Sequence, residues 1–337
     1  MIKEAIAKVI DRINLTRRQM EEVMEEILTG KATNSQIACL LTALRAKGET
    51  VDEITGAVAV MRRHVNRINI KKGTVLDTCG TGGDRKGTFN ISTAAAFVAA
   101  GCGIVVAKHG NRSISSLCGS ADLLERLGID INMDANKAKA CLEKVGIAFL
   151  FAPNFHPAMK YAMPVRQEIG IRTLFNLLGP LTNPADATHQ LVGVYASEWA
   201  EVIANVLKNL GTKHALVVHG EDGLDEITTA ARTKVSELKN GKIRTYSIKP
   251  EDFGIKRVKI NTLLGQDAAC NAEILERTLE GGVGAQRDIV VLNAAAAIYA
   301  ADRAKSIKEG IKLAKESIDS GAALNKLELL RKYSKEK

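Results

Sequence analysis

Residues 74–108, TVLDTCGTGGDRKGTFNISTAAAFVAAGCGIVVAK, decide the fold of this chain. The β-rich run TVLD ends in a glycine-rich loop, NISTAAAFVAAG has the composition of a buried helix, and GIVVAK is a second strand. Strands that alternate with helices are joined by right-handed crossovers and form a mostly parallel sheet, so the stretch predicts an α/β fold. Although residues 87–107 carry no charge, their Asn, Ser, Thr and Gly residues favour a buried loop, helix and strand over a membrane-spanning helix.

The chain beyond this stretch continues the same alternation. Strands are expected at 148–152, 190–195 and 214–220, and the turn sequence KNGK predicts a small antiparallel excursion within 234–262. Helices are expected over SSLCGSADLLERLG and over the alanine-rich NAAAAIYAA near the end of the chain. The segment PNFHP…LTNP, residues 153–184, contains no clear strand and is expected to carry helix and loop.

The first seventy residues predict helices alone. Thr16 with Gln19 fits a capping box, and Asn34 or Ser35 is expected to open the helix that stops at Gly48. A further capping box is expected at TVDE, residues 50–53.

The pattern changes at Gly73, which sets the expected domain boundary. We expect a small helical domain over residues 1–72, with a helical return near 160–185, and a larger α/β domain over residues 73–337. Two domains agree with the length of 337 residues, given roughly 150 residues per domain.

The composition narrows the class of protein. Apolar residues make up 46% and charged residues 25% of the chain, which argues against disordered, collagenous and coiled-coil proteins. Lys and Arg number 47 against 38 Asp and Glu, and the net charge of +9 suits nucleic acid, an anionic membrane surface or a small phosphorylated substrate. Because aromatic residues make up 4%, base stacking is poorly provided for and nucleic acid is a weak hypothesis.

The cysteines and the N-terminal segment indicate the compartment. The six cysteines form no C-x-x-C pair, so neither a zinc site nor a disulfide framework is expected, and they fit a reducing cytoplasm. The opening MIKEAIAKVIDRINL carries frequent charges and lacks the apolar core of a signal peptide. We therefore expect a cytoplasmic protein with no membrane segment.

Three loops at strand ends carry most of the candidate chemistry. Ligands of open α/β sheets bind beyond the carboxyl ends of the strands. The first such loop, CGTGGDRKGT before NIST, combines glycines with a helix start rich in Asn, Ser and Thr, which suits a phosphate group. A tight strand-to-helix turn is the simpler interpretation, and neither the P-loop nor the dinucleotide pattern is complete.

The second loop, KHGNRSISS at residues 108–116, is followed by GSAD. Two cations, glycines and hydroxyls suit a second phosphate group, although a capped helix with solvated charges has the same composition. The third, EDGLDE at residues 221–226, gathers carboxylates that suit Mg²⁺, or else form a solvated acidic turn. Arg166 and Arg172 can each pair with a substrate carboxylate, or form an ordinary surface ion pair with Glu168.

Five motifs resemble those of the anthranilate phosphoribosyltransferases, which join anthranilate to phosphoribosyl pyrophosphate in tryptophan biosynthesis. They are DTCGTGGD at 77–84, NIST at 90–93, KHGNRSISSLCGSAD at 108–122, VRQEIGIRTLFNLLGPLTNP at 165–184 and GEDGLDE at 220–226. The motifs occur in the family's order, and the similarity covers essentially the whole chain. The resemblance implies the nucleoside phosphorylase type of fold, Mg²⁺ as cofactor, and a homodimer assembled through the helical domain, with no nucleic-acid partner.

The resemblance also implies roles for particular residues. Ser92, Asp225 and Glu226 would hold Mg²⁺, and Gly80, Asn111 and Arg166 would contact anthranilate, with Arg166 on its carboxylate. Lys108, His109 and Asn111 are the candidate catalytic residues, although His109 is better explained as orienting the loop or the nucleophile than as transferring a proton. The residues expected to bind phosphoribosyl pyrophosphate are Gly80, Gly83, Asp84, Thr88, Asn90, Ile91, Ser92, Thr93, Lys108, His109, Gly110, Asn111, Arg112, Ser113, Ile114, Ser115, Ser116 and Ser120.

The chemistry of the implied reaction fits these groups. The bond to pyrophosphate should break ahead of nucleophilic attack, so the departing charge must be stabilised by Mg²⁺, Lys108 and the N–H groups of the GTGGD loop. The amino group of anthranilate is neutral at pH 7 and needs no strong base. Two alternatives remain open: a class II pyrimidine nucleoside phosphorylase, and a non-catalytic relative that binds nucleic acid.

Overall fold

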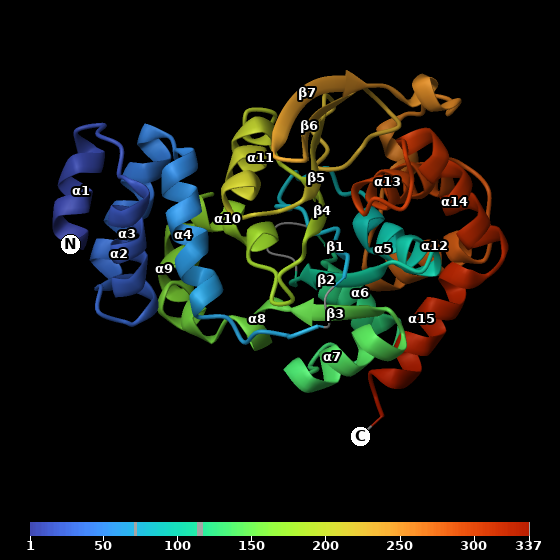
Figure 1. Ribbon diagram of the computed structural model, residues 1–337, viewed down its shortest axis with the longest axis horizontal. Helices are drawn as coiled ribbons and strands as arrows, with labels where there is room; N and C mark the ends of the chain where they lie inside the picture. The colour runs from blue at the N-terminus through green and yellow to red at the C-terminus, as the bar shows by residue number, and fades with distance from the viewer. Residues whose placement is uncertain (71–72, 113–116, 337) are drawn as a thin grey trace.

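One seven-stranded sheet forms the centre of the molecule (Figure 1). The computed structural model describes residues 1–70, 73–112 and 117–336. The strand order is β3-β2-β1-β4-β5-β6-β7; the pairs from β3 to β5 are parallel and the last two pairs are antiparallel. The strands are β1 (Val75–Asp77), β2 (Val105–Gly110), β3 (Ile147–Phe151), β4 (His189–Gly193), β5 (His214–Gly220), β6 (Thr233–Lys239) and β7 (Lys242–Ile248).

The predicted strands are confirmed, but the antiparallel excursion predicted within residues 234–262 is shorter than expected. Every residue of β1, β3, β4 and β5 is buried, as expected of parallel strands covered on both faces. Asn240 and Gly241 turn the β6–β7 hairpin with φ of +51° and +73°, which is the turn that KNGK predicts. Beyond β7 the antiparallel excursion does not continue, because proline at the start of PEDF favours the 3₁₀ helix η3 (Pro250–Phe253), and η4 (Ile260–Leu263) follows.

A layer of helices lies on one side of the sheet (Figure 1). The alanines of α5 are almost completely buried, and their small side chains let α5 lie close to its neighbours α13 and α15. This layer forms the larger of two hydrophobic cores. Its helices are α5 (Ile91–Gly101), α12 (Ala268–Leu279), α13 (Ala285–Ala300), α14 (Ile307–Asp319) and α15 (Ala322–Tyr333).

A second hydrophobic core joins the N-terminal helices to the other face of the sheet. Figure 1 shows the N-terminal helices at one end of the molecule, with α11 between them and the sheet. Apolar residues of α9 and α10 pack into this same core, so the segment near 160–185 lies against the N-terminal helices. The helices are α1 (Ile2–Ile10), α2 (Arg17–Leu28), α3 (Asn34–Lys47), α4 (Val51–Arg63), α9 (Met163–Ile169), α10 (Leu174–Leu178) and α11 (Trp199–Asn209).

Two helix starts differ from the prediction. The capping residue of α3 is Thr33, not Asn34 or Ser35, because Gln36 three residues later completes a capping box with it. The helix expected over residues 115–128 begins at Ser120 as α6 (Ser120–Arg126), since Asp122 turns back to accept a hydrogen bond from the Gly119 amide. The capping boxes predicted at Thr16 and in TVDE are confirmed.

The helix α7 (Ala135–Lys144) packs against β2 and β3. The short segments α8 (Ala152–Phe155) and η1 (Pro157–Tyr161) lead from β3 to α9, and η2 (Gly179–Leu181) follows α10 on the way to β4. No helix in the described part of the chain combines the length and the apolar character needed to cross a bilayer.

The strand order fixes where a ligand can bind. From β1 the chain proceeds through β2 to β3 on one side, whereas β4 and β5 lie on the other side of β1. Adjacent loops that leave such a switch point in opposite directions open a crevice beyond the carboxyl ends of the strands. The crevice therefore lies between the loops that follow β1 and β4.

Candidate active site

The glycine-rich loop after β1 is fastened to the loop after β4. The amide of Thr81 donates to the carbonyl of Gly193 at 2.8 Å, and the hydroxyl of Thr81 accepts from the amide of Tyr195 at 3.1 Å. Gly82 and Gly83 have φ of +64° and +77°, a backbone conformation that is strained in residues with a Cβ atom and that glycine adopts freely. The predicted loop thus closes the crevice from the β1 side.

Polar groups without partners gather in this same loop and at the start of α5. Within the described residues, Asp84 Oδ2, Asn90 Oδ1 and Thr93 Oγ1 are buried and have no hydrogen-bond partner. The amide N–H groups of Gly83, Asp84 and Arg85 likewise donate to no described group. Buried polar groups are nearly always paired in folded proteins, so such a concentration indicates a place for a polar ligand.

Lys108 ends in this cluster, not in open solvent. Its side chain is buried, and Nζ lies 3.3 Å from Thr78 Oγ1, 3.4 Å from the Thr78 carbonyl oxygen and 3.4 Å from Ser92 Oγ. The lysine therefore connects β2 to the loop after β1 and to the first turn of α5. Its positive charge lies behind the glycine-rich loop.

His109 and His156 form a buried pair. The ring nitrogens Nε2 of the two residues are 3.2 Å apart, and His109 Nδ1 is 3.0 Å from the carbonyl oxygen of Gly179. Since that carbonyl only accepts, His109 carries its proton on Nδ1, and His156 Nε2–H donates to His109. Burial lowers the pKa of His109 to about 3, with His156 lowering it further, and burial lowers the pKa of His156 to about 4. Both imidazoles are neutral at pH 7.

The rest of the loop after β2 turns toward α6. Arg112 is half-exposed and pairs with Asp122 at 2.8 Å and Glu125 at 2.6 Å, so its charge is shared with carboxylates in this state. Asn111 is exposed, and its carbonyl oxygen accepts a hydrogen bond from Ser120 Oγ at 3.3 Å. The predicted contacts Ser113, Ile114, Ser115 and Ser116 lie outside the described residues.

The acidic loop after β5 reaches the same crevice. A Cβ atom built on Gly80 would lie 3.3 Å from Asp225 Oδ2, which places that carboxylate against the glycine-rich loop. Burial raises the pKa of the Asp225 carboxyl and Asp84 raises it further; burial and Asp225 raise the pKa of Glu226, against the opposing effects of Lys108 and Ser92. Carboxylates crowded in this way favour a bound cation or a proton.

The donor set fits Mg²⁺ that is shared with a substrate. Within the described residues, no three His, Cys, Asp or Glu side chains form a complete metal site. Mg²⁺ is usually bound by one or two carboxylates together with substrate phosphates. Asp225 and Glu226, with the hydroxyl of Ser92 beside them, supply such a partial set.

The two arginines of the 165–184 motif have different surroundings. Arg166 is partly buried, with its guanidinium 5.4 Å from the Phe175 ring centroid and Nη1 3.5 Å from Met163 Sδ; among the described residues it has no carboxylate partner. Arg172 donates to the carbonyl oxygen of Gly83 and stacks 4.5 Å from the Tyr195 ring centroid. Neither arginine pairs with Glu168. Among the described residues neither arginine has a carboxylate partner, and Arg172, unlike Arg166, is bonded to the glycine-rich loop.

Several site residues were not predicted from the sequence. His156 lies between α8 and η1 and reaches the site only because the chain returns there after β3. Gly193 ends β4, and a Cβ atom on it would lie 1.5 Å from the carbonyl oxygen of Asp225. A buried strand that ends in glycine is a sequence signal for such a close approach, and it was available in HQLVG.

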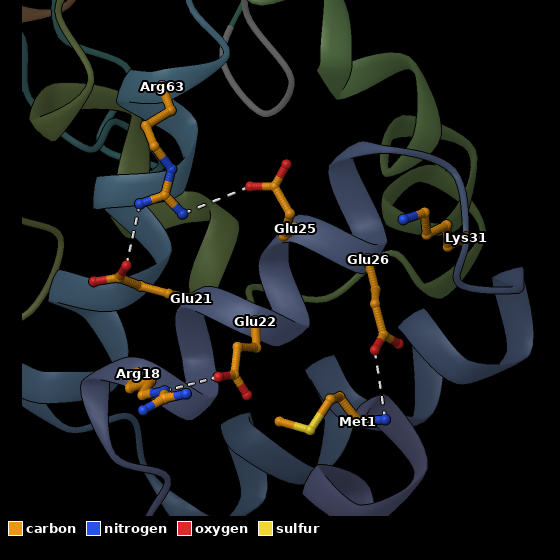
Figure 2. Close-up of a pocket in the computed structure, with 8 residues that line it drawn as sticks. All are labelled: Met1, Arg18, Glu21, Glu22, Glu25, Glu26, Lys31 and Arg63. Atoms are coloured by element: carbon orange, nitrogen blue, oxygen red, sulfur yellow. Dashed lines mark hydrogen bonds and ion pairs between the residues drawn. The ribbon is translucent and has the colours of Figure 1, made fainter.

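A separate pocket of about 420 Å³ lies among the N-terminal helices α1, α2 and α4, away from these loops (Figure 2). Figure 2 shows its charges paired with one another: Arg63 with Glu21 and Glu25, Arg18 with Glu22, and the N-terminal amine with Glu26. Its carboxylates are therefore neutralised within the protein. The crevice, with its unpaired groups, is the better candidate site.

Comparisons with known proteins identify the family of the chain. The helical bundle domain of the glycosyl transferase family matches residues 3–65, and the a/b domain of that family matches residues 72–324. The anthranilate phosphoribosyltransferase of Desulforamulus reducens is 53% identical over 99% of this chain and 97% of its own length. That of Syntrophobacter fumaroxidans is 51% identical over 100% of both chains.

Solved structures give the same result. The anthranilate phosphoribosyltransferase of Thermus thermophilus has a TM-score of 0.93 and 41% identity, over 98% of this chain and 99% of that chain. The Saccharomyces cerevisiae enzyme, solved in complex with PRPP and Mg, has a TM-score of 0.90 and 28% identity, over 99% of this chain and 97% of that chain. On the evidence of sequence, fold and coverage together, the chain belongs to the anthranilate phosphoribosyltransferase family.

Proposed function

We propose that the loops after β1, β2 and β5 carry out the reaction of this family. The phosphoribosyl group of phosphoribosyl pyrophosphate (PRPP) passes to the amino group of anthranilate, giving N-(5-phosphoribosyl)anthranilate and pyrophosphate, the second step from chorismate in tryptophan biosynthesis. The observation that carries the proposal is the row of unpaired buried groups in Asp84, Asn90 and Thr93, at a helix start next to a glycine loop.

The polar groups around the crevice divide into two sets. Backbone amides of the GTGGD loop and the first turn of α5 donate to phosphate oxygens, with Lys108 behind them. Asp225, Glu226 and Ser92 hold Mg²⁺, which when bound neutralises the pyrophosphate and stabilises its departing charge. Further contacts to PRPP are assigned to Gly80, Gly83, Thr88, Ile91, Gly110, Asn111, Arg112 and Ser120, and to residues 113–116.

Stabilisation of the leaving group is the main contribution of the chain. Lys108 is buried, so its charge acts in a medium of low dielectric constant and is little screened by water. His109 is neutral and both its ring nitrogens are engaged, so it holds the loop and Gly179 in place and does not remove a proton. The amino group of anthranilate attacks as the neutral amine and loses its proton after the new bond has formed.

Anthranilate is oriented by its carboxylate. Arg166 is partly buried beside Phe175, and burial lowers its pKa, because its charge is poorly solvated there. A substrate carboxylate would restore the missing partner. Gly80 and Asn111 complete the proposed anthranilate site.

The test is a direct assay. The protein is incubated with PRPP, Mg²⁺ and anthranilate, and the loss of anthranilate fluorescence is followed. The wild type should turn over only with Mg²⁺, and the double variant Asp225→Asn, Glu226→Gln should lose Mg²⁺-dependent turnover by a factor of about 100 or more, since several kcal/mol of charge stabilisation disappear.

A matched control lies in the same loop. Glu221 is exposed, and Glu221→Gln removes one negative charge without touching the crevice. Its turnover should equal that of the wild type. Wild-type turnover by the double variant would exclude Asp225 and Glu226 from metal binding.

We also propose that two copies of the chain associate through the N-terminal helices. Ile10 and Ile13 are 61% and 53% exposed beside the neighbouring outer face of α3, where Cys39, Thr42 and Ala46 are exposed and uncharged. An apolar, uncharged face on adjacent helices is typical of a homodimer interface. We place the enzyme in the cytoplasm, because all six cysteines are unbridged thiols.

A further inference from the structure

Asp77 is a buried carboxylate directly beneath the candidate active site. It is the last residue of β1, and its exposed fraction is 0%. A charged side chain is almost never fully buried unless several partners compensate for its lost hydration. The partners of Asp77 therefore indicate what the residue does.

Those partners lie at the start of one loop and just before the start of another. Asp77 Oδ1 accepts from the amide of Cys79 at 3.0 Å, at the start of the glycine-rich loop, and from the amide of His109 at 3.2 Å, one residue before the end of β2. One oxygen thus links the two chain segments from which the loops proposed to hold PRPP begin.

The second oxygen joins a third segment to the same point. Asp77 Oδ2 accepts from Asn183 Nδ2 at 2.7 Å, and the same amide group donates to the carbonyl of Ala107 at 2.7 Å. Asn183 precedes β4, so the carboxylate connects the starts of both loops to the segment that leads into β4. Burial raises the pKa of the Asp77 carboxyl to about 6, and Lys108 and the three hydrogen bonds oppose that rise.

Asparagine has the shape of aspartate but cannot make this set of bonds. If its carbonyl oxygen accepts from the two amides, its NH₂ group faces the NH₂ group of Asn183. If the side chain is flipped, its NH₂ group faces two N–H donors. Either orientation opposes donor to donor, and one loop start must move.

We propose that Asp77 is a positioning residue for PRPP binding, acting by holding the glycine-rich loop and the loop after β2 at a fixed separation. The inference rests on the proposed function. Asp77 itself does not contact the substrate; it acts through the backbone of Cys79 and His109. Loss of the carboxylate should therefore weaken binding of the phosphorylated donor more than binding of anthranilate.

The test compares Asp77→Asn with a matched variant, Glu53→Gln. Glu53 is also 0% exposed, and it accepts from the backbone amides of Leu15 at 2.9 Å and Thr50 at 2.8 Å, and from Lys47 Nζ at 3.0 Å. It lies in α4, among the N-terminal helices. Both variants replace a buried carboxylate by its isosteric amide. Only one of them underlies the loops.

Kinetics and hydrogen exchange provide the readouts. Hydrogen bonds to charged groups contribute about 1.5–3 kcal/mol, so Asp77→Asn should raise the KM for PRPP by roughly 10- to 100-fold, with a change of less than about threefold in the KM for anthranilate. Amide exchange should rise in peptides covering residues 78–90 and 108–112. Glu53→Gln should leave both KM values unchanged and raise exchange only around residues 15 and 50.

The outcomes separate this inference from the proposed function. An inactive wild type contradicts the proposed function; an active wild type together with an Asp77→Asn variant of normal KM for PRPP and normal exchange overturns the role of Asp77. Equal losses for both substrates also overturn it. If Asp77→Asn does not fold, Asn183→Ala leaves both bonds to Asp77 Oδ1 in place and removes the bond to Oδ2, together with the bonds of Asn183 to Ala107 and Ala185. It should raise the KM for PRPP by a smaller factor while leaving that for anthranilate unchanged.

Discussion

At the residue scale, Arg166 offers the sharpest test of substrate recognition. Arg166→Ala should raise the KM for anthranilate by roughly 10- to 100-fold, because a charge-assisted bond of about 1.5–3 kcal/mol is lost, with less effect on the KM for PRPP. Steady-state kinetics with each substrate varied in turn provides the measurement. Arg244 is a suitable control, since it stacks 5.5 Å from the Tyr246 ring centroid on the far strand β7, and Arg244→Ala should leave both KM values unchanged.

Equal losses for both substrates would remove Arg166 from the recognition of anthranilate. The arginines also show how far residue types alone can predict a site. The motifs give Arg112 to PRPP and Arg166 to anthranilate, but they do not show which charge is already paired within the protein. In the structure Asp122 and Glu125 on α6 pair with Arg112, whereas Arg166 lies beside Phe175 and Met163 and forms no ion pair with a described residue. Ion pairing between segments is a tertiary property, and no local pattern predicts it.

At the element scale, the end of β4 controls the acidic loop. A Cβ atom on Gly193 would overlap the carbonyl of Asp225, at 1.5 Å, and backbone at that distance must move. Gly193→Ala should therefore lower the free energy of unfolding by about 1–3 kcal/mol, the usual effect of overpacking, and also reduce turnover by displacing Asp225. Thermal unfolding and kcat at saturating Mg²⁺ are the measurements.

A second glycine separates this effect from the general effect of added bulk. Gly179 has helical φ and ψ of −48° and −59°, and a Cβ atom there would meet nothing within 4 Å. Gly179→Ala should leave the melting temperature unchanged or raise it slightly, because alanine restricts the unfolded chain. A melting temperature for Gly193→Ala equal to that of Gly179→Ala would contradict the proposed close contact.

Elements were easier to predict than their neighbours. Alternating strand and helix patterns predict β1 to β5 because burial on both faces selects continuous apolar runs such as HALVVHG. The sequences of β1 and β4 do not predict that these strands are neighbours, since the order of strands in a sheet depends on how the crossover helices pack. For that reason the sequence predicted three separate candidate loops but not the bonds from Thr81 to Gly193 and Tyr195, which join the loop after β1 to the loop after β4.

At the scale of the whole molecule, the net charge of +9 does not describe the site. Lys108 is buried and Arg112 is paired with carboxylates, so the cations of the motifs are few and are held within the protein. The unpaired groups in the crevice are mainly neutral donors and carboxylates. A small anionic substrate bound together with Mg²⁺ suits this balance, and a long polyanion does not.

The last prediction concerns assembly. Ile10→Glu places a charge on the proposed interface, and desolvating that charge in an interface costs several kcal/mol, so the variant should be a monomer. Light scattering coupled to gel filtration measures the mass directly, and the wild type should have twice the mass of one 36.2 kDa chain. Val283, which is 92% exposed beyond α12, supplies the control: Val283→Glu adds the same charge outside the helical layer and should remain a dimer. Because the crevice is built from one chain, monomeric Ile10→Glu should retain turnover. If the variant loses both turnover and the ability to dimerise, the partner chain supports the site. A monomeric wild type would contradict the proposed interface itself.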